Sequence, residues 1–392
     1  MIETEILKIL INFTLSKQPG IINHIIWLFA NLLDNEELCH IIINTVPNFI
    51  TIINTLLKEY SNTYIFKDIF ENLSWLVFRI FTHTGDRYIE NFFVSFPIFS
   101  KVLENEVDSY SLNMEIGNNT DSDYDDNLLN SVLRLFEKFA KYIEDAETLK
   151  NLIYSNLLTA MMKLLSRNVQ NSQIKISSGL LFLVFRIIGG LLTSDNDSDI
   201  DYILNNFNFV EVVERILTNN NSFNGFEESS DYSKRILKDI AWCMSNITGG
   251  SKSQVDRVLN SSIPVLLINY AKVFKESNFI KEVLYMFYNA FDYGSYEAKN
   301  KVLSEVVVNL ICDAIINMNY KHEITKYALD FLKLILTEAK SMFEMNVYYR
   351  IKKILEINDI PNFLNKLQLD KNQGISEMAE FLLLDNWSVF EY

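Results

Sequence analysis

Apolar residues recur along this chain at the spacing of one helix face. Ile240, Met244 and Ile247 stand three or four residues apart within residues 239–247, and this spacing predicts an amphipathic helix. The pair Gly249–Gly250 follows directly and predicts the end of that helix, because glycine is favoured at left-handed helix stops.

The next segments predict a three-helix unit. After a short helix, Pro264 falls where a first helical turn tolerates proline, and a third helix carries an aromatic residue. The longest apolar run, Gly179–Leu192, is interrupted by Arg186. It is too short to cross a hydrocarbon layer of about 30 Å, so we predict a buried helix, with Gly189–Gly190 as a helix stop.

One signature occurs twice, as Trp27-Leu-Phe-Ala-Asn31 and Trp242-Cys-Met-Ser-Asn246. Residues four apart lie on the same helix face. Repetition of the pair therefore predicts a ladder, in which each rung is an aromatic residue and the residue four positions later.

The spacing of the rungs indicates the repeat class. Subtracting residue numbers gives 48 from Trp27 to Trp75 and 43 from Trp242 to Tyr285. It gives 46 both from Tyr285 to Phe331 and from Phe136 to Phe182. Such a period is typical of helical repeats of the HEAT and armadillo kind. We therefore expect an all-α fold, an armadillo-repeat right-handed superhelical solenoid of about seven or eight three-helix repeats.

Two longer gaps interrupt the period, 61 residues from Trp75 to Phe136 and 60 from Phe182 to Trp242. Each contains a polar stretch, so we expect acidic insertions at about 104–127 and 194–232 in a single solenoid over 1–392. The simplest interpretation is solvated loops, and the alternative is an acidic patch that steers basic ligands.

Composition favours helices and a basic partner. Only 5 Pro and 11 Gly occur in 392 residues, too few for the many turns of a strand-rich fold. The formal net charge of −15 disfavours nucleic acid and anionic membrane surfaces as partners. The cysteines Cys39, Cys243 and Cys312 are far apart and odd in number, which fits a reducing compartment.

Enzymatic chemistry finds no pattern in the sequence. The four histidines are dispersed without metal-ligand spacing, and the paired glycines lack the context of a phosphate loop. We therefore expect no enzyme activity, no catalytic residue, no metal and no cofactor.

The segment Leu237–Gly250 resembles the third helix of a late armadillo repeat of importin-α, the family of nuclear import adaptors. Ile280–Asn289 is similar to the following helix, with Tyr285 in place of Trp, and Ile360–Trp387 resembles the closing repeat. The resemblance is good from about residue 234 to the end, weaker over 21–87 and faint between.

The resemblance implies an adaptor, found in cytoplasm and nucleus, that binds Lys/Arg-rich nuclear localisation signals in extended form along a concave Trp/Asn groove. It assigns the peptide-binding residues of a C-terminal site to Asp239, Trp242, Ser245, Asn246, Glu282, Tyr285 and Asn289. It assigns those of a weaker N-terminal site to Trp27, Asn31, Asp34 and Trp75, where Arg79 replaces the second Asn and is expected to repel a lysine.

The residue types suit that chemistry. An Asn amide both donates to and accepts from a peptide main chain, and the aromatic rings flank the aliphatic stems and cationic heads of Lys or Arg. The family's basic N-terminal segment, which binds importin-β, has no counterpart before Trp27. Importin-β and an export factor are partners of the family, but without this segment the resemblance does not imply that they bind this chain. The alternative function is an armadillo-repeat scaffold for protein interactions, without a transport role.

Overall fold

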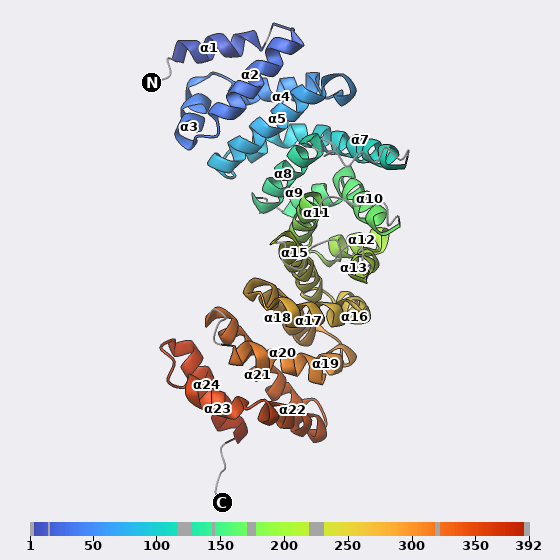
Figure 1. The fold of residues 1–392 in the computed structure, drawn as a ribbon, viewed down its shortest axis with the longest axis vertical. Coiled ribbons are helices and arrows are strands. Elements are labelled where there is room, and N and C mark those ends of the chain that lie inside the picture. The colour runs from blue at the N-terminus through green and yellow to red at the C-terminus, as the bar shows by residue number, and fades with distance from the viewer. Residues whose placement is uncertain are drawn as a thin grey trace, which may run out of the picture. The chain divides into compact units, whose positions relative to one another are not determined.

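The computed structural model describes residues 4–14, 16–115, 127–142, 146–170, 178–218, 231–317 and 322–387. Within these ranges the chain is helical and contains no strand, as the sequence predicts (Figure 1). It divides into two compact units, residues 1–199 and 200–392.

The first unit holds the helices from α1 to α11 and the start of α12. They are α1 (Thr4–Phe13), α2 (Pro19–Leu32), α3 (Glu36–Thr45), α4 (Phe49–Glu59), α5 (Thr63–Thr84), α6 (Ile89–Phe92) with the 3-10 turn η1 (Phe93–Ser95), α7 (Phe96–Glu115), α8 (Asn127–Tyr142), α9 (Ala146–Ile153), α10 (Asn156–Gln170), α11 (Ser178–Leu191) and α12 (Asp197–Phe207).

The second unit holds the rest of α12 and the helices to the C-terminal end. They are α13 (Phe209–Thr218), α15 (Asp231–Thr248), α16 (Lys252–Leu259), α17 (Ile263–Phe274), α18 (Ser277–Tyr293), α19 (Tyr296–Val302), α20 (Glu305–Ile316), α21 (His322–Ser341), α22 (Met345–Ile357), α23 (Ile360–Leu367) and α24 (Gln373–Trp387).

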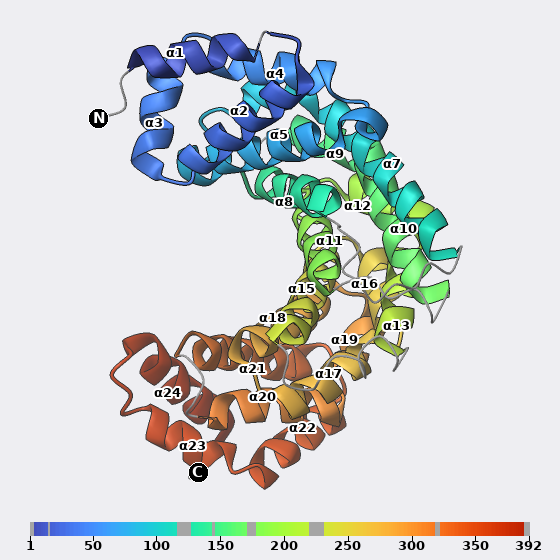
Figure 2. The ribbon, with the colours of Figure 1, turned by 45° about the horizontal axis from the view of Figure 1, so that its top comes forward.

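The helices of each unit group in threes, after an initial α1–α2 pair. Each group ends in a helix, called here the third helix, that packs against the third helix of the next group in the same unit. In unit 1 this row is α2, α5, α8 and α11 (Figure 2). In unit 2 it is α15, α18, α21 and α24. The cores are apolar and rich in Phe, with Phe29, Phe70, Phe185 and Phe291 almost fully buried.

The segment from α16 to α18 shows why the sequence folds into such a group. Ser251 and Gln254 form a capping box, in which the Ser251 backbone N–H donates to Gln254 Oε1 at 3.0 Å, and this begins α16. Pro264 lies in the first turn of α17, as predicted. The buried residues of α18 then recur three or four positions apart, from Phe279 and Val283 to Phe287 and Phe291, along one face of the helix.

Parts of both expected insertions are helical. α7 continues to Glu115, with Val107 on its inner face fully buried. α12 begins at Asp197, and its residues Ile203 and Leu204 reach the core. Asp197 and Ser198 of α12 are exposed, whereas Asp199 is buried and accepts a hydrogen bond from the Tyr154 hydroxyl at 3.0 Å. Residues 116–126 and 219–230 lie outside the described ranges.

Neither glycine pair is the left-handed stop predicted for it. Gly189 and Gly190 lie inside α11 and are buried, and a Cβ on Gly190 would meet the Cβ of Ala140 at 3.1 Å. Gly190 therefore allows α11 to approach α8 closely. Gly249 does follow the end of α15, where its N–H donates to the carbonyl of Ser245 at 3.1 Å, but its φ is not positive.

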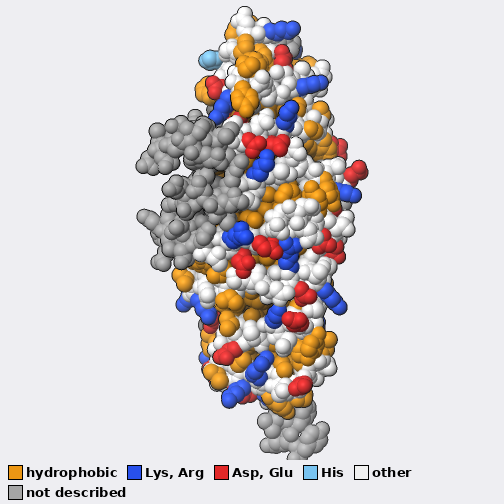
Figure 3. Space-filling view, turned by 90° about the vertical axis from the view of Figure 1, so that its right-hand side faces the viewer, with side chains coloured by type: hydrophobic (Ala, Val, Ile, Leu, Met, Phe, Trp, Pro, Cys, Tyr) orange, Lys and Arg blue, Asp and Glu red, His pale blue; other side chains and the backbone are white. Residues whose placement is uncertain are grey.

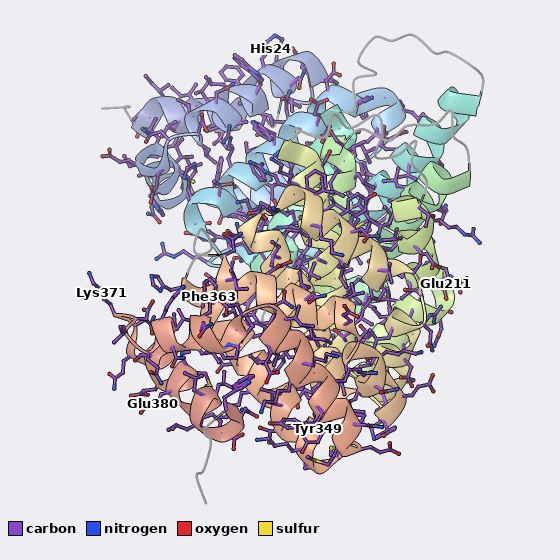
Figure 4. The ribbon with its side chains drawn as sticks, turned by 60° about the horizontal axis from the view of Figure 1, so that its bottom comes forward. His24, Glu211, Tyr349, Phe363, Lys371 and Glu380 are labelled. Carbon is purple, nitrogen blue, oxygen red and sulfur yellow. The ribbon has the colours of Figure 1, made fainter. Side chains whose placement is uncertain are left out.

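Adjacent groups are joined by specific polar contacts as well as by the apolar core. In unit 2, Arg257 of α16 donates from Nη2 to both carboxylate oxygens of Glu211 of α13, at 2.9 and 3.0 Å. Figure 4 labels Glu211. The backbone N–H of Ser262 donates to Glu214 Oε1 at 2.6 Å. These contacts connect one group of helices to the preceding one.

Candidate functional site

Burial fixes the register of the third helices in unit 2. Phe279, Val283 and Phe287 of α18 are buried, and so are the residues 43 positions earlier in α15. Trp242 of α15 therefore corresponds to Tyr285 of α18, and Asn246 to Asn289, as the sequence predicts. All four are half-buried on the same face of the row.

The next helix does not carry the predicted rung. Phe331 of α21 is fully buried and contacts Phe291 with ring centroids 6.4 Å apart. The buried positions of α18 and α21 are 45 apart, so Asp330 and Leu334 are the counterparts of Tyr285 and Asn289. The spacing of 46 residues from Tyr285 selected Phe331, a core residue one position after the true counterpart, Asp330. The amide ladder of unit 2 therefore ends after two rungs.

The two amide rungs are tied together directly. Asn289 Nδ2 donates to the backbone carbonyl of Ser245 at 2.9 Å, from α18 to α15. This uses one of the two amide donors of Asn289 to connect the helices, and leaves its side-chain oxygen as an acceptor. Ser245 itself is buried, and its hydroxyl donates to the Trp242 carbonyl at 2.9 Å.

Asp239 is not on the rim of the ladder. Its carboxylate is fully buried, with the Lys238 ammonium 3.5 Å from Oδ1. Asp239, which the resemblance assigned to the peptide-binding residues, therefore does not present its carboxylate to a peptide, because the helix turns that position toward the core. We use the name ladder face for the remaining half-buried residues, which are Trp242, Asn246, Glu282, Tyr285 and Asn289.

Carboxylates and tyrosines border the ladder face at α21. The rings of Tyr285 and Tyr327 lie 4.0 Å apart between centroids, and Tyr288 lies 5.2 Å from Tyr327. Burial raises the pKa of the Tyr327 hydroxyl, so it stays protonated and can donate a hydrogen bond. Burial also raises the pKa of Asp330, against the opposing effect of Lys326 and Lys333.

Tyr327 and Asp330 were missed by the sequence analysis. Aligning the apolar positions of consecutive helices, instead of matching one aromatic residue to the next, would have placed Asp330 at the position of Tyr285. Lys281 is a further addition, because its ammonium pairs with Glu323 and lies 5.5 Å from the Tyr285 ring centroid. The hydrogen bond to Glu323 raises the pKa of Lys281.

Unit 1 places its four predicted residues on α2, on the turn after it and on α5. Trp27 is 57 % exposed, and Asn31 donates its amide back to the Trp27 carbonyl at 2.8 Å. Asp34 pairs with Arg79 of α5 at 2.7 Å, and Trp75 is half-buried. The residues are brought together, but Arg79 is in contact with two of them.

The later helices of unit 1 do not continue the ladder with aromatic residues. Phe136 of α8 is fully buried against α7, with its ring centroid 6.5 Å from that of Phe99, so the rung assigned to it by spacing does not exist. Phe182 is half-buried. Arg186, one turn later, forms an ion pair with Glu137 of α8, with 3.9 Å between Arg186 Nε and Glu137 Oε1.

Other kinds of site find little support within the described residues. No group of three or more His, Cys, Asp or Glu side chains gathers there to hold a metal ion. No single described helix is long and apolar enough to span a membrane, and the one stretch that passes by length and composition is the α3–α4 pair, bent by 91°. On the face shown in Figure 3, acidic and basic side chains are interspersed rather than segregated.

Comparison with known proteins identifies the fold. No family model matches the chain, and no curated protein matches it in sequence. A designed armadillo repeat protein in complex with the peptide (KR)4 is similar in structure, with a TM-score of 0.50 and 18 % identity over 71 % of this chain and 98 % of that one. Computationally designed armadillo repeat proteins for modular peptide recognition give a TM-score of 0.51 and 16 % identity, with the same coverage.

A further solved structure extends the likeness along the chain. A protein from a study of the interaction between cadherin and beta-catenin matches with a TM-score of 0.61 and 12 % identity, over 95 % of this chain and 59 % of that one. These likenesses confirm that the chain is all-helical with an armadillo-repeat fold. The resemblance to importin-α stays a prediction.

Proposed function

We propose that this armadillo-repeat chain is a nuclear import adaptor that binds Lys/Arg-rich localisation signals, in extended form, on the ladder face of unit 2. The observation that carries the proposal is the pair of consecutive aromatic and amide rungs, Trp242/Asn246 and Tyr285/Asn289, joined by the Asn289 to Ser245 hydrogen bond of 2.9 Å. Cytoplasm and nucleus are the proposed locations.

The chemistry of the ladder face suits a cationic, extended ligand. The Trp242 ring can contact a Lys or Arg head, for about 0.5–1 kcal/mol at an exposed site. At Tyr285 the ligand's cation would compete with the Lys281 ammonium, which lies 5.5 Å from that ring centroid. Glu282 and Asp330 supply half-buried carboxylates beside the rings. The amides of Asn246 and Asn289 can pair with the peptide main chain, at about 1 kcal/mol for each net hydrogen bond. A few such contacts support micromolar affinity after the cost of ordering the ligand.

Two rungs set the length of the ligand. Packed helices lie about 8–10 Å apart, and an extended chain advances about 3.3 Å per residue, so consecutive rungs hold cations about three residues apart. A segment of four or five residues fills both rungs. We therefore expect a short, single basic cluster to bind nearly as well as a signal with two clusters.

Fluorescence anisotropy with a labelled Lys-rich localisation peptide tests the proposal. The double variant Asn246→Ala with Glu282→Gln removes an amide and a carboxylate while leaving the Asn289 contact to Ser245 in place. We expect it to weaken binding about tenfold or more, since each lost contact contributes on the order of 1 kcal/mol.

Asn206→Ala is the matched control. Asn206 is an exposed helical asparagine in the same unit, and its amide donates to the Tyr202 carbonyl, but it does not belong to the ladder face. Its removal should leave the affinity unchanged. Equal affinity of the double variant and the unaltered chain would contradict the proposed site.

The second candidate function is a scaffold that holds basic proteins without a transport role. The observation that favours it is the shortness of the amide ladder in unit 2, since Asp330 and Leu334 replace the third rung. Purely electrostatic capture predicts equal competition by a scrambled basic peptide, whereas the adaptor predicts a preference for the native order. Recruitment of importin-β or an export factor belongs to the adaptor proposal and is tested by their co-elution with a cargo-loaded chain.

A further inference from the structure

The register of unit 1 is as well defined as that of unit 2. Phe70 and Leu73 of α5 are buried, and so are Ile22 and Ile25 of α2, each 48 positions earlier. The Asn72 amide donates to Asn23 Oδ1 at 2.8 Å and joins the same two helices. With this offset Trp75 corresponds to Trp27, and Arg79 stands where the first rung has Asn31.

Arg79 makes the contacts that the ladder chemistry would offer to a ligand's cation. Its guanidinium carbon lies 4.5 Å from the centroid of the Trp75 ring. Its Nη1 lies 2.7 Å from Asp34 Oδ1. The Arg79 side chain is 23 % exposed, against 61 % for that of Asp34. A ring face and a neighbouring carboxylate are therefore both in contact with a cation of the chain itself.

A second cation of the chain covers the neighbouring ring. Phe78 stacks on Trp75 with centroids 5.0 Å apart, and the Lys138 ammonium from α8 lies 5.4 Å from the centroid of Phe78. A basic ligand approaching this pair of rings would meet two positive charges at short range. The positive charges of Arg79 and Lys138 would repel the cation of the ligand. The Arg79 contacts also have an entropic advantage over those of a ligand, because they are intramolecular and form without the entropy cost of association.

We propose that Arg79 is a specificity-determining residue, an internal ligand that fills the Trp75 rung and so excludes basic segments from unit 1. Basic ligands are thereby confined to unit 2. The inference rests on the slot chemistry of the proposed function but on a different site. Arg79→Asn restores the pattern of Trp27 and Asn31 at Trp75, frees the carboxylate of Asp34 and opens the rung.

The test separates unit 1 from the ladder face of unit 2. In the background of Asn246→Ala with Glu282→Gln, we measure anisotropy of a labelled (Lys-Arg)4 peptide with and without Arg79→Asn. The opened rung should raise the affinity about tenfold, through one ring face and one carboxylate. Adding Trp75→Ala should abolish the gain, because the ring is what the new cation contacts.

Two controls distinguish an opened rung from a change of surface charge. Arg134→Asn makes the same substitution at an exposed arginine of α8, and should raise the affinity by less than about twofold, as a screened charge effect. Arg79→Lys keeps the cation and should leave the rung closed. An Arg79→Asn variant without a gain, an equal gain from Arg134→Asn, or an equal gain from Arg79→Lys would each overturn the proposal.

The result is independent of the fate of the proposed function. If the unaltered chain does not bind the peptide and the Arg79→Asn chain does, the ladder face of unit 2 is not the site but Arg79 is the residue that closes unit 1. If the unaltered chain binds through unit 2 and Arg79→Asn adds nothing, the proposed function holds and the role of Arg79 is refuted. Amide exchange of α5 establishes that the variants are folded.

Discussion

Phe331 distinguishes the register seen in the structure from the register suggested by aromatic spacing. The structure buries its ring completely, with the rings of Tyr288 and Phe291 at centroid distances of 5.5 and 6.4 Å. Replacing a fully buried Phe by Ala costs about 3–5 kcal/mol through lost burial and a residual cavity. A rung residue on an open face would cost about 0.5 kcal/mol or less.

The loss should be local, because each repeat contacts only its neighbours and stability in such arrays is a sum of repeat and interface terms. Native-state hydrogen exchange resolves this, since it reports opening of individual segments. Phe331→Ala should lower the protection of α18, α21 and α24 by about 10²-fold or more, up to the limit set by their own opening free energies. Protection of α2 and α5 in unit 1 should not change.

Phe381→Ala is the matched control, because its ring is 44 % exposed on α24. It should reduce protection in the same helices by less than about tenfold. If Phe331→Ala changed the protection of α21 no more than Phe381→Ala does, while weakening peptide binding, Phe331 would be a rung and the register derived from burial would be wrong.

Two further predictions concern buried charge in unit 2. Lys299 pairs with Glu338 at 2.7 Å and is 8 % exposed. Lys299→Met should therefore lower the free energy of unfolding, measured with a chemical denaturant, by about 3–5 kcal/mol, and adding Glu338→Leu should recover most of the loss. An unchanged free energy of unfolding in the single variant would contradict the burial of the pair. Burial is the main cause that raises the pKa of Asp330 above its ordinary value of 3.8. At a pH above the folded-state pKa the ionised carboxylate therefore destabilises the folded state, whereas at a pH below 3.8 the carboxyl is protonated in both states and this destabilisation vanishes. Asp330→Asn should therefore raise the thermal midpoint at pH 7 but not at pH 3, and an equal rise at both pH values would show that ionisation is not the cause.

The fold could be predicted because the repeat has three independent signals in the sequence. Apolar periodicity, helix-start residues such as Pro264 and a spacing near 45 residues all indicate short helices stacked in threes. The correspondence of Trp27 with Trp75, and of Trp242 with Tyr285, followed from the same spacing and agrees with burial. These features are local or nearly local, so one sequence carries them.

The site was less predictable, for reasons that lie between helices. Phe136 and Phe331 match a rung in residue type, yet both are core residues, because one step along a helix turns a side chain by about 100°. The same rotation places Asp239 inside rather than at the rim. The contact of Arg79 with Asp34 joins residues 45 positions apart, and no pattern within either helix indicates it.

Glycine function was also set by tertiary contact. The sequence context of Gly189 and Gly190 resembles a helix end, but α11 continues through both and uses the missing side chain of Gly190 to approach Ala140 at short range. A glycine that ends a helix and one that admits a neighbouring helix are indistinguishable until the neighbour is placed.

The polar contacts between Arg257 and Glu211, and between Ser262 and Glu214, mean that the repeats of unit 2 are not interchangeable parts. Apolar faces of repeated helices could stack in any order, but moving or deleting the group α16–α18 would separate these particular carboxylates from their donors. A chain that skipped one repeat during folding would lose the same contacts. Each such pair is therefore specific to two adjacent repeats. A gene rearrangement that changed the order of the repeats would also have to supply new polar partners at each new junction.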